Sequence, residues 1–187
     1  MSERFDVVPT RIAGLMALQR KPIGDARGFL ERLYCEQELR PLLGEVRIQA
    51  VNRTRTARRG TVRGLHFQRP PHVEDKVVQC LRGEVLDVAV DLRRGSPTFL
   101  RWHAEVLSAE NHRTLLVPRG FAHGFQTLCD DCEMLYLHTA AHHPASEGGL
   151  DALDPRLAIQ WPLQVSERSA RDQGHPPLEA SFTGIDP

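Results

Sequence analysis

A histidine in an otherwise apolar, glycine-containing segment is the first residue of this sequence that could do chemistry. His66 lies in RRGTVRGLHFQ, residues 58–68, and Lys76 follows shortly after it. An imidazole exchanges protons near neutral pH and an ammonium group can stabilise an oxyanion, so this pair suits proton abstraction next to a carbonyl group. The structural alternative is a buried histidine with one hydrogen bond and a lysine that reaches solvent. Taken alone, the two residues favour that alternative, because buried polar groups usually find partners without any catalytic role.

A second histidine raises the question of a metal site. The segment PRGFAH, residues 118–123, resembles the second motif (PxGxxH) of the cupin superfamily, whose metal-binding members also carry a first motif similar to G-x5-H-x-H-x3,4-E. Here Gln68 replaces the second histidine of that first motif, and Lys76 stands where a pocket-facing carboxylate would be needed. Two histidines beside an ammonium group make a poor site for zinc or iron. We therefore expect His66 and His123 to lie in a pocket without a metal.

The other potential metal ligands lack a complete pattern. Cys129 and Cys132 form a C-x-x-C, but no second pair completes a zinc site, and we expect reduced thiols beside a turn. His138, His142 and His143 have no accompanying carboxylate pattern, so we expect them to be loop histidines in solvent.

The elements that must position these residues are short strands. From Val46 to Leu137, alternating or apolar segments are separated by turn residues, which indicates an antiparallel sandwich or barrel. We expect strands over residues 46–51, 60–68, 76–81, 84–92, 101–107, 114–118, 124–128 and 133–139. The sequence therefore predicts an all-β fold.

Helix and irregular chain complete the expected domain. One short helix is predicted over residues 35–45, ended by Gly44, and a single turn within residues 166–172. We expect one domain over residues 1–187, with an irregular C-terminal segment from about residue 163 that wraps over the body or partly frays.

Side chains alternate along a strand, so the pattern assigns them to faces. His66 and Gln68 share one face of the first histidine-bearing strand, and Arg63 lies on the other. In residues 85–92, Asp87 faces away from the apolar row formed by Leu86, Val88, Val90 and Leu92. A face with histidine, glutamine and aspartate among small residues predicts a pocket lined from several strands.

The charge balance excludes some partners. The 24 basic and 24 acidic residues leave no net charge, so no long-range field favours binding to nucleic acid or to a membrane. The first residues lack a basic stretch followed by an apolar run, and no apolar run is long enough to span a bilayer. We expect a cytoplasmic protein that binds anions, if at all, through local groups.

Several segments, taken together and in order, resemble the dTDP-4-dehydrorhamnose 3,5-epimerase family. They are GTVRGLHFQ, DKVVQCLRGEVLDVAVDLRRGSPTF, LSAENHRTLLVPRGFAHGFQTL, EMLY and DPRLAIQWP, and the resemblance extends from about Asp25 to Asp172. It implies a double-stranded β-helix, a jelly roll of the cupin type, with short peripheral helices. It also implies a homodimer without metal or cofactor that inverts C3, C5 or both in a nucleotide-linked 4-keto-6-deoxy sugar.

The resemblance implies a role for each residue that matches the family's catalytic positions. His66 becomes the general base that removes a proton next to the keto group, and Asp172, in SERSARD, pairs with it and favours the imidazolium. Lys76 lies near the keto oxygen, where its charge stabilises the enolate. Tyr136, in EMLY, returns a proton from the opposite face, which is what inversion requires.

The resemblance also implies a set of substrate-binding residues. Arg63 and His123 contact the substrate or its diphosphate, and Arg27, in DARGF, reaches the nucleotide from near the dimer partner. The other residues expected to bind substrate are Gln49, Asn52, Gln68, Asp87 and Arg32. Because strict alternation turns Arg63 away from the pocket, a pocket-lining Arg63 would require a β-bulge at Gly64.

Two departures from the family pattern keep alternatives open. Arg32 stands where many members have a glutamate that recognises the base, so the nucleotide could be one other than dTDP. TAAHHPAS, residues 139–146, replaces a YYxP-like stretch, so inversion at C3 or C5 alone is an alternative. Two further alternatives remain. One is a metal-dependent cupin oxygenase or isomerase, and the other is a non-catalytic cupin that binds a sugar nucleotide. The full set of His66, Lys76, Tyr136 and Asp172 argues against the binding module, which needs no base and acid together.

Overall fold

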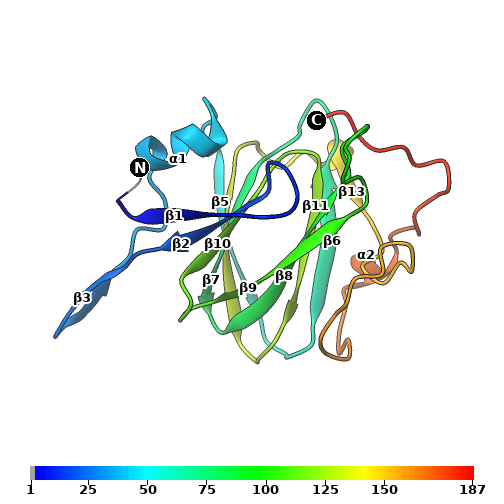
Figure 1. The fold of residues 1–187 in the computed structure, drawn as a ribbon. Coiled ribbons are helices and arrows are strands. Elements are labelled where there is room, and N and C mark those ends of the chain that lie inside the picture. Colours follow the sequence, from blue (N-terminus) through cyan, green and yellow to red (C-terminus); the bar gives the residue numbers. More distant parts are fainter. Residues whose placement is uncertain (1–2) are drawn as a thin grey trace.

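Two antiparallel β-sheets face each other in the computed structural model, which describes residues 3–187 (Figure 1). The larger sheet contains, in spatial order, β1 (Phe5–Pro9), β2 (Met16–Arg20), β10 (Arg113–Val117), β7 (Lys76–Arg82), β12 (Cys132–His138) and β5 (Ala50–Thr56). The smaller sheet contains β13 (Glu147–Gly149), β6 (Val62–Gln68), β11 (Phe121–Thr127), β8 (Glu84–Asp91) and β9 (Trp102–Ser108). All pairings between neighbouring strands in these two sheets are antiparallel. The all-β prediction is confirmed.

Short elements lie around the two sheets. A hairpin of β3 (Ile23–Asp25) and β4 (Gly28–Leu30) projects away from the body (Figure 1). The helices are α1 (Glu36–Leu43), α2 (Ala170–Gln173) and the 3-10 helix η1 (Pro144–Ser146). No helix in the described part of the chain is long and apolar enough to cross a membrane.

Helices form in both of the segments that the sequence predicts to be helical. Gly44 ends α1 with a φ of 74°, and its N–H donates to the carbonyl oxygen of Arg40. Glycine adopts this positive φ without the steric cost that a side chain would add. Ser169 caps the single turn of α2, because its hydroxyl accepts the N–H of Asp172. Both predicted helical segments are therefore confirmed.

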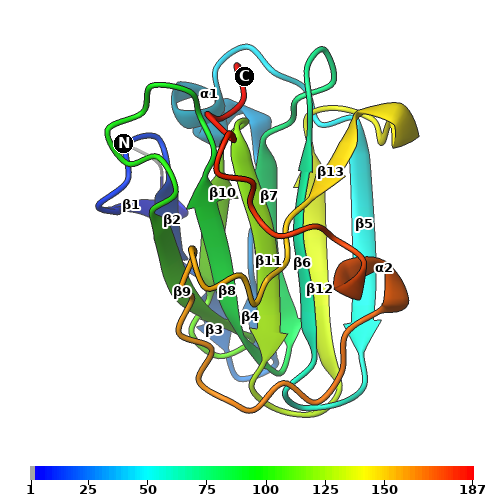
Figure 2. The same cartoon turned by 90° about the vertical axis from the view of Figure 1, so that its right-hand side faces the viewer.

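The apolar core has three layers. Between the sheets, Val85, Ala89 and Phe125 belong to a buried cluster, as the alternation of β8 requires. On the outer face of the five-stranded sheet, Val88 and Val90 pack against residues of the C-terminal segment, which crosses this face in Figure 2. On the outer face of the six-stranded sheet, a third cluster includes residues of α1. Residues of the C-terminal segment thus pack on the outer face of the five-stranded sheet.

The strand expected over residues 46–51 begins later than predicted. The structure has β5 over Ala50–Thr56, an edge strand with the sequence AVNRTRT. Polar residues occupy both of its faces, so no apolar alternation marks it. The short N-terminal strands and β13 were also not predicted. The remaining expected strands correspond, in chain order, to β6 through β12.

Candidate active site

A cavity of about 410 Å³ opens between the two sheets and is lined from both of them. Most of the residues that the sequence nominated line it: Asn52, Arg63, His66, Lys76, His123, Tyr136 and Asp172. They come from five strands and from α2, so segments distant in sequence converge on one hollow. Pockets with converging polar and titratable groups are the usual places of binding and catalysis.

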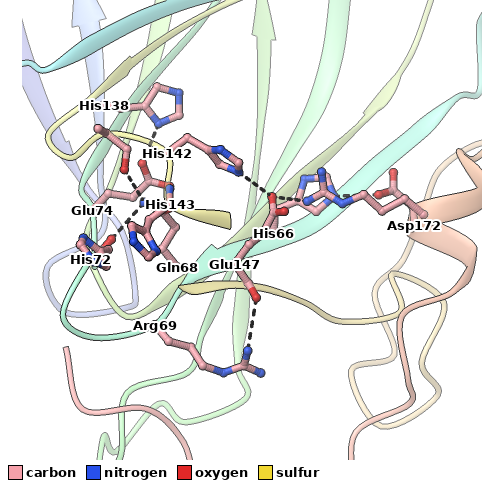
Figure 3. Close-up of polar contacts among 12 residues, drawn as sticks. His66, Gln68, Arg69, His72, Glu74, His138, His142, His143, Glu147 and Asp172 are labelled. Atoms are coloured by element: carbon pink, nitrogen blue, oxygen red, sulfur yellow. Dashed lines mark hydrogen bonds and ion pairs between the residues drawn. The ribbon is translucent and has the colours of Figure 1, made fainter. Parts of the chain in front are cut away.

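His66 and Asp172 form a dyad at one wall of this cavity (Figure 3). The Nε2 atom of His66 lies 2.7 Å from Oδ1 of Asp172, and 4% of the aspartate side chain is exposed against 32% of the imidazole. When Nε2 carries the hydrogen of this bond, the second ring nitrogen, Nδ1, keeps a free lone pair. His66 can then act as a base through Nδ1.

Asp172 is held in place by three groups besides His66. The N–H of Gly64 donates to its Oδ2 at 3.2 Å, the capping hydroxyl of Ser169 accepts its own N–H, and Arg168 donates to its carbonyl oxygen at 2.7 Å. Burial raises the pKa of Asp172, but the hydrogen bond and charge of His66, with the other donors, outweigh this and lower it below its usual value. The carboxylate of Asp172 therefore stays ionised and can accept the hydrogen of the imidazole.

A β-bulge brings Arg63 and His66 to the same cavity. His66 pairs with His123 and Arg63 pairs with Phe125, and the register shifts between these two pairs. Gly64 lies within the shift at a φ of 118°, and a Cβ there would come within 2.7 Å of the Cα of Gly124. The predicted bulge is confirmed, and the face that strict alternation gave to Arg63 is wrong.

Lys76 belongs to a buried chain of charges. Its Nζ lies 3.4 Å from the carbonyl oxygen of His66 and 3.3 Å from Oε1 of Glu74, whose Oε2 accepts from Nδ1 of His138 at 2.8 Å (Figure 3). Burial raises the pKa of Glu74, but the hydrogen bond from His138 and the charge of Lys76 outweigh it and lower the pKa. The expectation that His138 is a loop histidine in solvent is wrong, because it lies on β12 and pairs with Glu74.

Tyr136 lies on the sheet that faces His66, whereas His123 and Asp87 lie on the same sheet as His66. The Nε2 of His123 lies 2.9 Å from both carboxylate oxygens of Asp87, and both side chains are buried. The ring of Tyr136 lies edge-on to His123 with centroids 6.1 Å apart. Burial and the charge of Asp87 raise the pKa of Tyr136, so its phenol keeps its proton at neutral pH and can donate it.

Five of the nominated residues do not line the cavity in the single chain, and one of them is Asp87, which is buried against His123. Gln68 is buried, and its amide donates to the carbonyl oxygens of His72 and Ala141 and accepts from the N–H of His143, which ties two loops together (Figure 3). The other three are Gln49 beside a neighbouring hollow, Arg27 on the β3–β4 turn, and Arg32 in an ion pair with Glu38.

Several cavity residues carry no recognisable motif in the sequence. Glu147 pairs with Arg171 and lies 3.4 Å from Nε2 of His142, and all three line the cavity. Glu147 reaches this place because β13 pairs with β6, aligning Glu147 with Gln68. His142 is exposed, as expected, whereas His143 stacks on His72 with ring centroids 3.8 Å apart. No sequence motif marks Glu147 or Arg171, because only the folded positions of β13 and α2 bring them to the cavity.

The arrangement suits proton transfer on two sides of a flat intermediate. His66 projects from β6 of one sheet and Tyr136 from β12 of the facing sheet. Lys76 lies on β7, next to β12, and its Nζ is 3.4 Å from the carbonyl oxygen of His66. A base and an acid on facing walls can remove a proton from one face of a carbon and return one to the other. Fold and site together define the class: an all-β barrel of the cupin type whose pocket is equipped for acid–base isomerisation.

Comparisons with known proteins name the family within this class. Residues 9–180 match the family model for dTDP-4-dehydrorhamnose 3,5-epimerase. The enzyme of that name from Salmonella typhimurium is 42% identical over 177 residues, which cover 94% of this chain and 97% of the relative. The chain belongs to the dTDP-4-dehydrorhamnose 3,5-epimerase family and is an isomerase of the nucleotide-sugar epimerase type. The resemblance stated from the motifs is confirmed.

Solved structures agree with the fold. The epimerase from Legionella pneumophila Philadelphia 1, in complex with dTDP-4-keto-L-rhamnose, is 38% identical with a TM-score of 0.89 and covers 97% of this chain and 98% of its own. ChmJ, a 3'-monoepimerase from Streptomyces bikiniensis in complex with dTDP-quinovose, is 33% identical with a TM-score of 0.82 and covers 90% of this chain and 86% of its own. The double-stranded β-helix prediction is confirmed.

Proposed function

We propose that this chain inverts both C3 and C5 of a dTDP-linked 4-keto-6-deoxyhexose. One observation carries the proposal: the His66–Asp172 dyad and Tyr136 line the same cavity, and His66 and Tyr136 project from facing sheets. The relative from Salmonella typhimurium is named a 3,5-epimerase, and the Legionella structure holds a dTDP-linked keto sugar. Both support the substrate class and the double inversion.

The proposed reaction begins at the carbon next to the keto group. His66 takes the proton through Nδ1, and the electrons of the C–H bond move into an enolate on the former keto oxygen. Lys76 stabilises that oxygen as its charge develops. Asp172 stabilises the imidazolium that forms, as an aspartate does for histidine in other acid–base enzymes.

Tyr136 completes the inversion. Its phenol gives a proton to the opposite face of the enolate carbon, the electrons return to restore the carbonyl, and the tyrosinate regains a proton from solvent. The imidazolium of His66 releases its proton to solvent as well. Base and acid are each worth about 10²- to 10⁴-fold in rate.

The diphosphate needs local positive charge in a neutral protein. Arg63 reaches the cavity beside β5, where its Nε donates to Oγ1 of Thr56 at 2.9 Å. A guanidinium offers parallel donors that match phosphate oxygens. We propose that Arg63 binds the diphosphate, with His123 and Asn52 nearer the sugar.

The hairpin of β3 and β4 supports a homodimer. Ile23, Phe29 and Leu30 are 49%, 65% and 64% exposed, and the side chain of Arg27 is 90% exposed at the turn. Contiguous exposed apolar residues on a projecting element mark interaction surfaces. We propose that this hairpin packs on a second copy of the chain and that Arg27 reaches the nucleotide in the partner's cavity.

Proton exchange in heavy water tests the function. With a dTDP-linked 4-keto-6-deoxyglucose, NMR should show deuterium entering at C3 and C5, and a His66→Ala variant should lose both signals. Exchange at one carbon alone would indicate a monoepimerase like ChmJ, a case favoured by the absence of an aromatic pair in residues 139–146. The CDP-, GDP- and UDP-linked sugars, assayed in parallel, establish the nucleotide. No exchange with any of the four would refute the proposal.

A further inference from the structure

We propose that His66, Asp172 and His175 form a binding site for a divalent transition-metal ion such as zinc or cobalt, and that the bound ion inhibits the enzyme. The site deepens the proposed function, because inhibition presupposes that His66 is the catalytic base. The role of this ion is regulatory: the reaction itself needs only the acid–base groups of the cavity.

His175 lies beside the dyad, in the turn that follows α2. Its ring is edge-on to the ring of His66, with centroids 5.7 Å apart and planes inclined by 73°. It occupies the space over Gly149, where a Cβ would come within 2.1 Å of the ring carbon Cε1. The bare backbone of Gly149 therefore makes room for the second imidazole.

The nitrogen that His175 turns toward Asp172 has no hydrogen-bond partner. Its Nε2 is buried and lies 3.9 Å from Oδ1 of Asp172, too far for a hydrogen bond. Buried polar atoms normally have partners, so an unpaired one calls for an explanation. A ligand between the three side chains would satisfy it.

The donor atoms have the spacing of a metal site. In the part of the chain that the structure describes, only this group of three histidine, cysteine or acidic side chains has donor atoms all within 4.8 Å of one another. Oδ1 of Asp172 is 2.7 Å from the His66 nitrogen and 3.9 Å from the His175 nitrogen. Tetrahedral zinc, with bonds of about 2.0–2.1 Å, keeps its ligands about 3.3 Å apart. A small shift of the His66 ring away from Asp172, and of the His175 ring toward it, would bring both distances to the spacing of a tetrahedral site.

The ligand set selects the class of ion. Two imidazoles and one carboxylate suit zinc, cobalt or nickel, whereas magnesium and calcium prefer oxygen ligands alone. Gly64 holds the second carboxylate oxygen through its N–H, so Asp172 is already oriented for coordination through Oδ1. A water molecule would complete the tetrahedron.

Metal binding at Nε2 would remove the base without blocking the cavity. The ion takes the place of the proton between His66 and Asp172, and a neutral imidazole then carries its one hydrogen on Nδ1. The lone pair of Nδ1, which the reaction needs, is lost. Because the ion lies on the Asp172 side of the ring, dTDP should bind as well as before, and kcat should fall while KM stays constant.

Cobalt titration tests the site without substrate. Protein freed of metals with EDTA and dialysed should develop the visible absorption of tetrahedral Co²⁺ at one ion per chain, and zinc should displace it. His175→Gln, which keeps most of the side-chain volume, should weaken binding by at least about tenfold. Gly149→Ala, which forces the ring away, should do the same. His142→Gln, a histidine change elsewhere in the cavity, is the control and should leave cobalt binding intact.

Zinc inhibition of deuterium exchange tests the consequence. The unaltered chain should lose exchange at zinc concentrations that saturate the cobalt site and regain it with EDTA, and the His175→Gln variant should exchange with or without zinc. Absence of cobalt binding, equal binding by His175→Gln, or equal inhibition of that variant would overturn the proposal. If cobalt binds as expected but no sugar nucleotide exchanges protons with solvent, the metal site is supported and the proposed epimerase activity is refuted.

Discussion

His66 and His123 lie directly opposite each other on paired strands, yet each is bound to a carboxylate of its own. His66 pairs with Asp172 and His123 with Asp87, so the two histidines of the cupin motifs are not free to share a ligand. Burial raises the pKa of Asp87, an effect that the charge of His123 partly offsets. His66 and His123 thus belong to two histidine–aspartate dyads with different exposure: 32% of the His66 side chain is exposed and 5% of the His123 side chain.

The first prediction concerns the carboxylate of the exposed dyad. Asp172→Asn should lower kcat by about 10²- to 10⁴-fold, because the amide neither stabilises the imidazolium nor fixes its tautomer. Steady-state kinetics and calorimetric titration with dTDP measure the effect. The dissociation constant of dTDP should stay within about twofold, since Asp172 lies behind His66; a parallel loss of dTDP binding would contradict the assigned role.

The second prediction separates proton removal from inversion. Tyr136→Phe keeps the ring that packs against the inter-sheet core but removes the acid, so His66 still exchanges the substrate proton with solvent. NMR in heavy water should show deuterium at the reacting carbon of recovered substrate, while inverted product falls by about 10²- to 10⁴-fold. If exchange and inversion fell together, Tyr136 would not be the second proton donor.

The third prediction concerns stability and pH. Glu74→Gln should lower the free energy of unfolding by about 3 kcal/mol at neutral pH, because it leaves Lys76 without its buried partner. The folded pKa of Glu74 is lowered, so its stabilising contribution is present above the unfolded pKa of about 4.3 and is lost as pH falls through the folded value. Urea unfolding at several pH values should therefore show a shallower acid-side loss in the variant than in the unaltered chain.

A matched control exists for that measurement. Asp6 and Lys21 form an ion pair at 2.8 Å whose side chains are 62% and 40% exposed. Asp6→Asn should change the free energy of unfolding by less than about 1 kcal/mol, because exposed pairs contribute little. Equal decreases in the free energy of unfolding for Asp6→Asn and Glu74→Gln would show that the buried Glu74–Lys76 pair stabilises the fold no more than an exposed pair does.

The fourth prediction concerns the hairpin. Phe29→Asp should convert the proposed dimer into monomers in light scattering, because burying an unpaired carboxylate in an apolar interface is costly. Leu153→Asp, at a leucine that is 47% exposed elsewhere on the surface, is the control and should leave the dimer intact. Arg27→Ala should keep the dimer and raise KM. A dimer that survives Phe29→Asp would place the interface elsewhere.

The sequence predicted the strand-borne residues of the cavity better than those on β13 and α2. His66, Lys76 and Tyr136 lie on strands with clear apolar alternation, so their neighbours in the chain indicated both the element and the cavity. Glu147 and Arg171 lack such a signal, because Glu147 lies on a three-residue strand and Arg171 on the single turn of α2. Local patterning cannot reveal contacts that only the closed barrel creates.

Dependence on local patterning also explains why the bounds of β5 and the environment of His138 differ from the predictions. β5 carries arginine, asparagine and threonine on an edge, where solvent and the cavity accept polar side chains on both faces. His138 lies in the strand expected over residues 133–139, but no local pattern predicts its partner Glu74. In both cases tertiary contacts replaced the apolar signal on which the predictions depend.

The partner of the base comes from the end of the chain. His66 and Asp172 are 106 positions apart, and every strand of the two main sheets precedes Asp172. During synthesis, which proceeds at about 5–20 residues per second, the barrel strands emerge before the aspartate does. Under the proposed roles, the nascent barrel therefore lacks the partner of its base until α2 packs against β6.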